Sequence, residues 1–385
     1  MGPRRRRHDR AVPEPGLIHR HRLAILLALV LAACTAPPLV APTSSVPAIV
    51  APTPPPDITF VAFARLLHDR DAAWRAGDVS AALALVAADA PVAFRERERQ
   101  LAALAAQGVP LVPVRGAVNV TRERGSVRII EILETDAQDR TRMVRYFGTG
   151  PLDQLRLTEP PASELGEPMT THGEHFDTRA TTLDAESCAT VLSYAEAALG
   201  PLVARLGEVY RPSRRATFEC VPTVQPDLPP LASAYTRGSV VSMLTTPSLV
   251  VASGPAAAWS RTAVTHELAH VLLFTRGNGP FLMAEGIPLW LTDDRRQPEL
   301  DRLVLANALW SLPHLIDGPA NDVEFFAGYA QASSFMRFVA VTYGDAAVLS
   351  AWEGNGSLPF EEAFTRGFRV TPEAAYAAWR ASLGR

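Results

Sequence analysis

The sequence His266-Glu267-Leu268-Ala269-His270 lies within an apolar run from Ala256 to Thr275, which reads AAAWSRTAVTHELAHVLLFT. This length and composition predict a largely buried helix. Because a helix turns by about 100° per residue, the two histidines are expected one turn apart on the same face. Two imidazoles in that arrangement can bind one metal ion, and Glu267 falls on the same half of the helix. The sequence therefore predicts a metal-binding helix in which Glu267 acts on a water molecule.

The alternative is a surface helix that carries a polar His-Glu-x-x-His patch by chance. The neighbouring residues Val264, Leu268 and Leu272 are apolar and indicate burial instead. Burying two histidines and a glutamate without a shared partner would cost several kcal/mol. The apolar surroundings therefore favour a metal site.

A zinc ion in a hydrolytic site has three protein ligands, so a third ligand is expected from another part of the fold. The stretch from Gly279 to Trp290, GPFLMAEGIPLW, is apolar except for Glu285. Pro280 suits the first turn of a helix there. An isolated carboxylate in such a helix is unfavourable unless it is paired or bound to metal. Gly286, which has no side chain, would allow another backbone to approach.

These residues resemble the gluzincin metallopeptidases, specifically the bacterial peptidase MA-like group, in which His-Glu-Leu-Ala-His is followed by Pro-x-Trp-Leu-x-Glu-Gly. The resemblance covers roughly residues 171–385. It implies a small sheet packed with helices, and a Zn²⁺ ion held by His266, His270 and Glu285. It also implies that Glu267 is the general base in peptide-bond hydrolysis.

The sequence departs from the family pattern at several positions. Leu282 and Met283 replace Trp-Leu, and Pro288 stands where the family has a small Ala. Pro288 removes a helical hydrogen bond, so we expect it to kink or end the helix just after Glu285. Asp293 and Asp294 remain as alternative ligands, as acceptors for a ligand histidine, or as solvated residues.

A further catalytic candidate is Tyr329, which belongs to a segment that resembles the family's Tyr-x-x-Ala segment after the metal helices. A tyrosine there could donate a hydrogen bond to the oxyanion of the transition state. The alternative is a core tyrosine whose hydroxyl meets a backbone carbonyl. The chain has no Gly-x-Met-Glu-Asn anchor for a free N-terminus, which favours an endopeptidase.

The N-terminus predicts a lipoprotein signal peptide over residues 1–33. Seven Arg precede an apolar segment, Leu23 to Ala33, that is too short to span a bilayer. The segment ends Leu31-Ala32-Ala33-Cys34, which resembles a bacterial lipobox with Cys34 as the lipid-bearing residue. Ordinary secretion with cleavage near Ala33 is the alternative. Residues 34–57 form a Pro-rich linker.

The signal implies an exported protein, either lipid-anchored to the outer face of the bacterial cytoplasmic membrane or periplasmic or extracellular. Its remaining cysteines, Cys188 and Cys220, could form one disulfide, with two buried thiols as the alternative. Removing residues 1–33 takes away seven Arg and two acidic residues, so the net charge changes from −3 to about −8. A mildly acidic chain argues against nucleic acid as a partner and leaves a peptide or protein substrate.

The chain divides into two predicted domains, and the fold class is α+β. Residues 58–165 are predicted to be a small α+β domain that resembles nuclear-transport-factor-two-like or cystatin-like domains. Residues 169–385 are predicted to be the gluzincin-like domain. The first domain is expected to contain helices over 60–88 (broken at Gly77-Asp78) and 94–106, and strands over 126–132 and 142–147, with His68, Asp69 and Asp71 on a solvated face. The second is expected to contain strands over 174–176, 215–221 and 248–252, a helix over 185–206, and helices after Pro255.

The sequence thus predicts zinc-dependent hydrolysis of peptide bonds in the cell envelope. One alternative is a zinc-containing lipoprotein that acts as a binding or maturation module with little turnover. Another is a scaffold without metal, in which the N-terminal domain binds the partner.

Overall fold

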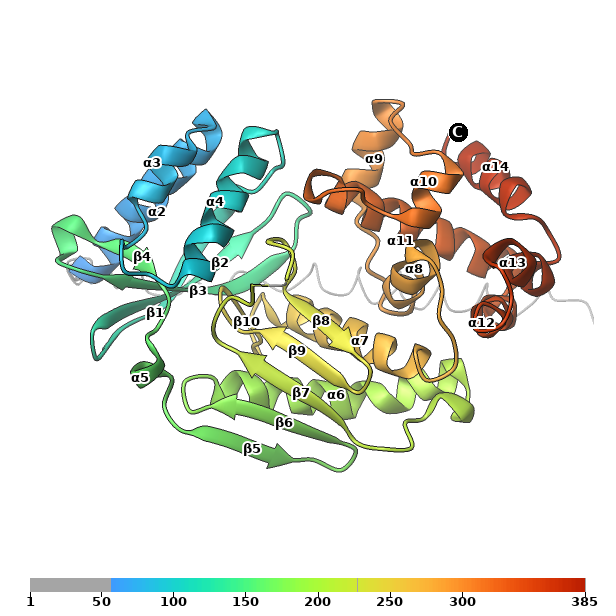
Figure 1. Cartoon of the computed structure of the whole chain (residues 1–385), viewed down its shortest axis with the longest axis horizontal. Helices are drawn as coiled ribbons and strands as arrows, with labels where there is room; N and C mark the ends of the chain where they lie inside the picture. The colour runs from blue at the N-terminus through green and yellow to red at the C-terminus, as the bar shows by residue number, and fades with distance from the viewer. Residues whose placement is uncertain (1–56, 227, 385) are drawn as a thin grey trace, which may run out of the picture. The chain divides into compact units, whose positions relative to one another are not determined.

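Residues 57–226 and 228–384 are described by a computed structural model, and they form an α+β fold with two five-stranded sheets (Figure 1). Residue contacts join 55–385 into one unit. The predicted signal peptide, Cys34 and the linker as far as residue 56 lie outside the described residues. The signal peptide, the lipid anchor and the linker therefore stay predictions.

Three helices open the described chain: α2 (Ile58–Ala76), α3 (Val79–Ala84) and α4 (Val92–Ala106). The break expected at Gly77-Asp78 is confirmed. Gly77 ends α2 in the left-handed conformation, with φ of 67°. Asp78 then caps α3 by accepting a hydrogen bond from the backbone N–H of Ala81 at 2.8 Å.

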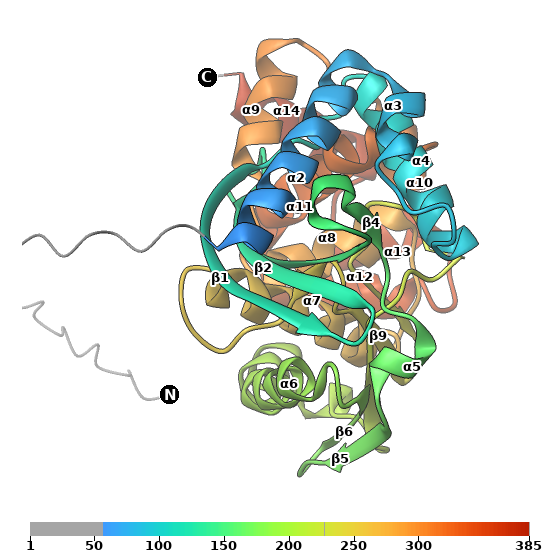
Figure 2. The same cartoon turned by 90° about the vertical axis from the view of Figure 1, so that its left-hand side faces the viewer.

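The first sheet has the order β1-β2-β3-β10, and β4 also pairs with β3. Its strands are β1 (Val114–Arg124), β2 (Val127–Thr135), β3 (Thr141–Thr149), β4 (Arg156–Thr158) and β10 (Ser248–Leu249). Figure 2 shows α2 against β1 and β2, where Phe63 and Leu67 join a core with Phe94 and Ile130. The strands predicted over 126–132 and 142–147 are confirmed as parts of β2 and β3.

One prediction for this region was wrong. Asp71 does not lie on a solvated face: its side chain is buried and forms an ion pair with Arg115 of β1. Arg115 also contacts Glu134 at 3.0 Å. His68 and Asp69 are exposed, as expected. Asp71 lies next to Arg70 on the buried side of α2. The positive charge of Arg115 on the neighbouring strand β1 offsets the cost of burying the Asp71 carboxylate.

The second sheet has the order β5-β6-β7-β9-β8. Its strands are β5 (Pro168–His172), β6 (Phe176–Thr181), β7 (Ala216–Val221), β8 (Ala234–Arg237) and β9 (Val240–Leu244). The pairs β6–β7 and β7–β9 are parallel, and the two outer pairs are antiparallel. The strand predicted over 215–221 is confirmed as β7. The strand predicted over 174–176 starts only at Phe176, because the N–H groups of His175 and Phe176 both bond to Glu196 of α6.

The strand predicted over 248–252 is shorter and belongs to the other sheet. Ser248 pairs with Val144 and Leu249 with Met143, both in β3. The chain therefore returns to the first sheet immediately before the helix that carries the histidine motif. This short strand joins the two parts of the fold through main-chain hydrogen bonds.

Helix α7, which carries the motif, packs against the helices α6 and α8 of the second part. The helices of this part are α6 (Ala185–Leu206), α7 (Ala257–Leu273), α8 (Phe281–Leu291), α9 (Gln297–Leu305), α10 (Leu312–Asp317), α11 (Phe325–Tyr343), α12 (Asp345–Gly354), α13 (Phe360–Phe368) and α14 (Pro372–Leu383); a short α5 (Ala162–Leu165) lies between the sheets in the chain. Helix α6 is long and apolar enough to cross a membrane, but here Val191, Ala195 and Leu199 lie in the core. The expected packing of α7 near a small sheet is confirmed by its contacts with β8 and β9.

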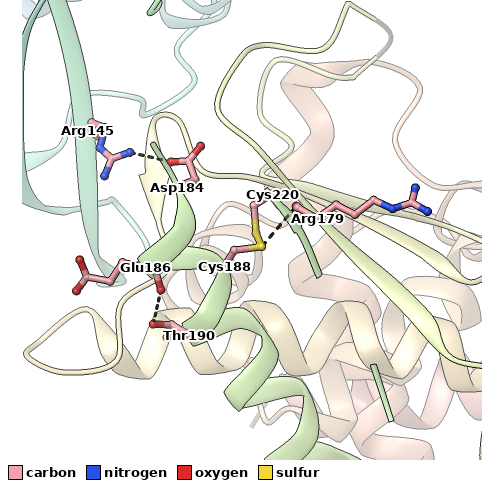
Figure 3. Close-up of a disulfide and its surroundings, with 7 residues drawn as sticks. All are labelled: Arg145, Arg179, Asp184, Glu186, Cys188, Thr190 and Cys220. Carbon is pink, nitrogen blue, oxygen red and sulfur yellow. Dashed lines mark hydrogen bonds and ion pairs between the residues drawn. A yellow bond between two sulfur atoms is a disulfide. The ribbon is translucent and has the colours of Figure 1, made fainter. Parts of the chain in front are cut away.

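A buried ion cluster also joins the two parts. Arg145 of β3 lies 2.8 Å from Asp184 at the start of α6 and 2.9 Å from Glu131 of β2. Figure 3 shows Arg145 and Asp184 facing each other above α6. All three side chains are almost completely buried. The contact therefore holds the first sheet against the start of α6.

The expected disulfide is present between Cys188 of α6 and Cys220 of β7 (Figure 3). Both residues are buried, so the bond ties the first turn of α6 to the central strand of the second sheet. The two cysteines are separated by 32 positions in the sequence.

Replacing both cysteines with alanine is expected to lower the free energy of unfolding by about 2–4 kcal/mol, because a loop of this length gains much freedom in the unfolded chain. Urea unfolding monitored by circular dichroism would measure the change. Adding reductant should lower the urea concentration at the unfolding midpoint of the wild type and leave the midpoint of the double variant unchanged. An unchanged midpoint in the double variant would show that the bond does not contribute to stability.

Candidate metal centre

Helix α7 brings the two motif histidines together. The Nε2 atoms of His266 and His270 lie 3.1 Å apart, and the rings are nearly perpendicular. The helix is held in place by Val264 and Leu268, which are fully buried on its core side. The His270 ring also stacks on Phe274 with an interplanar angle of 7°. Packing therefore fixes both rings before any ligand binds.

The third group comes from α8, which places Glu285 opposite the two rings. Its Oε2 lies 3.4 Å from Nε2 of His266 and 3.4 Å from Nε2 of His270. Pro288 does not end the helix, because α8 continues for three residues past it to Leu291. The missing N–H of Pro288 removes a single helical hydrogen bond, the one to the carbonyl of Ala284.

The geometry of these three atoms fits a zinc ion. Ligands bound at about 2.0–2.1 Å in a tetrahedral arrangement lie about 3.3 Å from one another. The three separations here are 3.1, 3.4 and 3.4 Å. Two imidazole nitrogens and one carboxylate oxygen also suit zinc better than calcium or magnesium, which prefer oxygen ligands. His266, His270 and Glu285 are therefore the residues that could hold the metal.

The charges of the three residues are strongly linked. Burial raises the pKa of Glu285, but the neighbouring His270 and His266 outweigh it and hold the pKa well below its usual range. Burial lowers the pKa of His270, and the Glu285 carboxylate more than offsets this, so the net shift is upward. The site therefore keeps an ionised carboxylate beside the two imidazoles.

Glu267 lies beside this group and has a partner that the sequence did not reveal. Its carboxylate accepts a hydrogen bond from the Thr236 hydroxyl at 2.8 Å. Thr236 belongs to the edge strand β8, which contacts α7. The Glu267 side chain is 8% exposed and lines the same cavity as the two histidines. Thr236 thus orients the carboxylate, and no feature of its sequence context indicates that role.

Tyr329 of α11 also reaches the site. Burial raises the pKa of its hydroxyl well above the usual value, and the charge of Glu285 and a hydrogen bond with it raise the pKa further. The ring stacks on Phe325 at 4.5 Å. The Arg296 guanidinium lies 4.7 Å from the centre of the same ring. The tyrosine is therefore a buried, neutral hydroxyl close to the candidate ligand Glu285.

Asp293 and Asp294, the alternative ligands, lie among arginines. Asp293 contacts Arg295 at 3.2 Å and also pairs with Arg337, and Asp294 contacts Arg296 at 3.2 Å. Neither aspartate belongs to the group of potential metal ligands found among the described residues. The buried Nδ1 of His270 likewise has no hydrogen-bond partner within residues 57–226 and 228–384. The hypothesis that one aspartate accepts a hydrogen bond from a ligand histidine is therefore not supported for His270, and Asp293, whose side chain is 64% exposed, fits the solvated alternative.

The role expected for Gly286 is confirmed. A Cβ atom at this position would lie 2.4 Å from Cγ of Met336 and 2.9 Å from the backbone oxygen of Ala332, both in α11. The glycine therefore allows α8 and α11 to pack closely at the residue next to Glu285.

Replacing Gly286 with alanine is expected to lower the free energy of unfolding by about 1–3 kcal/mol, because α8 and α11 must move apart. The shift should also weaken zinc binding by moving Glu285. Thermal unfolding and a competitive zinc titration would measure the two effects. Gly200, whose Cβ would meet no atom within 4 Å, provides the control position. Equal results for the two variants would contradict the packing argument.

A cavity of about 850 Å³ contains the site. It is bounded by α7, by the loop before β8, and by the segment between α8 and α9. The N-terminal part of the fold supplies another wall, which includes Arg70, Trp74, Arg97, Arg140, Arg142 and Tyr146. No sequence pattern predicts that this part reaches the candidate metal site, because tertiary contacts alone bring it there.

Comparison with known protein families and with curated proteins gives no match for this chain.

Proposed function

We propose that this protein hydrolyses peptide bonds with the help of a zinc ion held by His266, His270 and Glu285. The convergence of these three groups beside Glu267, inside a cavity, is the observation that supports the proposal. Under this proposal the chain is a gluzincin-like metallopeptidase, exported and anchored through a lipid on Cys34.

Zinc, when bound, would polarise the substrate carbonyl and make a nearby water more acidic. Glu267 would accept a proton from that water and pass it to the departing amine. Thr236 would keep the Glu267 carboxylate turned toward the water, since its hydroxyl already donates to that carboxylate. Tyr329 would donate a hydrogen bond to the oxygen that gains negative charge. Its neutral form at working pH is assured by the upward shift of its pKa.

The proposal is tested by measuring zinc and peptide hydrolysis in the same preparation of residues 55–385. We expect one zinc per chain and hydrolysis that is lost with a chelator and restored by zinc. A variant with alanine at His266 and His270 should lose both. A matched variant with alanine at His68 and His172, which are exposed and lie outside the site, should lose neither. Wild-type protein that retains no zinc after equilibration would end the proposal.

A further inference from the structure

The most unusual cation next to the candidate metal centre is Arg296, the last residue of the segment between α8 and α9. Its side chain is 10% exposed, stacks on Tyr329 and lies 3.2 Å from Asp294 through Nε. Its Nη1 is buried and has no hydrogen-bond partner in the part of the chain that the structure describes. Arg296 also lines the cavity that contains the metal site.

Two features of Arg296 are unfavourable unless something binds to it. A buried N–H of a cation without an acceptor loses its hydration without compensation. The backbone of Arg296 is also in the left-handed region, with φ of 47° and ψ of 41°, which residues other than glycine rarely adopt. Strain of this kind is most often found where it positions a functional group. The exposed tenth of the side chain borders the cavity, so an acceptor there could reach the guanidinium.

The charges around Arg296 indicate an anionic acceptor. Arg140, in the turn between β2 and β3, lines the same cavity from the N-terminal part. Burial lowers the pKa of Arg296, the Asp294 carboxylate raises it, and the like charge of Arg140 lowers it further. Asp136 already binds Nε and Nη2 of Arg140. Arg140 and Arg296 both line the cavity, and a guanidinium binds a full negative charge more strongly than a neutral carbonyl, since a charged acceptor roughly doubles the strength of each hydrogen bond.

The distance from Arg296 to the metal site fits a short piece of peptide. The guanidinium carbon lies 4.7 Å from the centre of the Tyr329 ring, and Tyr329 lies close enough to Glu285 for that carboxylate to raise the pKa of its hydroxyl. Adding about 2.8 Å from ring centre to hydroxyl oxygen and about 3.5 Å for a contact between hydroxyl and carboxylate puts the guanidinium within about 11 Å of the Glu285 carboxylate. The hydrogen bond from the guanidinium to its acceptor takes up about 2.8 Å of this distance. An extended peptide covers about 3.3–3.6 Å per residue, so no more than about two residues fit in the remainder.

We propose that Arg296 binds the terminal carboxylate of a peptide substrate, so that the substrate chain ends one or two residues after the bond that is cut. This inference rests on the proposed function and specifies its substrate class: peptides with a free C-terminus. Hydrolysis adds one water across the C–N bond, leaving a new carboxylate on the shortened peptide and a free amine on the released residue or dipeptide. Arg296 would therefore hold the C-terminus of the substrate. Cleavage would then occur near that end, and not at the internal bonds expected from the sequence.

The test uses binding, with turnover blocked by replacing Glu267 with Gln. Five-residue peptides with varied last residues, each made as a free acid and as an amide, would be titrated calorimetrically into zinc-loaded Glu267→Gln protein. We expect the acid of at least one pair to bind about tenfold or more tightly than its amide. Adding Arg296→Met should remove this preference by weakening the acid alone. Arg296→Lys, which keeps the charge, should retain part of it.

Arg295→Met is the matched control, because Arg295 is the neighbouring residue, has a 61% exposed side chain and pairs with Asp293. It should leave the preference for the acid unchanged. Equal binding of acid and amide by every pair, absence of binding by all peptides, or an acid preference that survives Arg296→Met in folded protein would each overturn the inference. Thermal unfolding of each variant establishes that it is folded.

Failure of this inference can be separated from failure of the proposed function. Hydrolysis by the wild type that releases internal fragments and is indifferent to amidation would leave the zinc peptidase intact and reject the carboxylate anchor. Selective binding of the acids without hydrolysis by the wild type would support the anchor and reject the peptidase.

Discussion

Replacing Glu267 with Gln is expected to lower kcat/KM for peptide hydrolysis by about 10³–10⁴-fold while one zinc per chain remains bound. The amide has nearly the same shape as the carboxylate and can still accept the Thr236 hydrogen bond, but it cannot take a proton from water. None of the three candidate ligands is altered. Activity and zinc content measured on the same sample would show both results.

Thr236→Val is expected to lower activity less than Glu267→Gln does. It removes the hydroxyl that holds the Glu267 carboxylate and should lower kcat by about tenfold, with zinc content unchanged. A Glu267→Gln protein that keeps hydrolysing at the wild-type rate would rule out the assigned base. A wild type that binds zinc and peptide without turnover would instead indicate a binding or maturation module.

Replacing Arg145 with Met is expected to lower the free energy of unfolding by about 3–5 kcal/mol, because it leaves the buried carboxylate of Asp184 without its cation and leaves Glu131 with Arg122 alone. Burial already raises the pKa of Asp184, which Arg145 partly counteracts. The loss should therefore be largest at high pH, where both groups are charged, and should shrink as the pH falls and they take up protons. Denaturant unfolding at several pH values would measure it.

Two further variants make this prediction specific. Combining Arg145→Met with Glu131→Gln and Asp184→Asn should recover much of the stability, since no uncompensated charge then remains. Arg65→Met, at a side chain that is 77% exposed, should change stability by less than about 0.5 kcal/mol. Similar losses for Arg145→Met and Arg65→Met would contradict the buried cluster as a main contact between the two parts.

The helices of the candidate site could be predicted well from the sequence because their apolar segments extend over many residues. The predicted bounds of α6 are confirmed, and those of α7 differ by one or two residues. The third candidate ligand, Glu285, could be identified because a single acid in an apolar helix needs a partner.

The strands were harder to predict, because whether a short segment forms a strand depends on the segments that pair with it. Strand β1 is rich in arginine, and β9 is a five-residue apolar run that does not distinguish strand from helix. The contributions of Thr236 and Arg296 could not be predicted at all. Each reaches the site only when segments far apart in the sequence pack together, so neither carries a local signal.

The short strand β10 has a consequence for how such a protein could evolve. Because residues just before the histidine helix complete a sheet made by the N-terminal part, a recombination point between the two halves would leave backbone groups of that sheet unpaired. The halves are therefore expected to be inherited together, and a gene fragment that encodes the His266–His270 helix alone should not spread as an independent module.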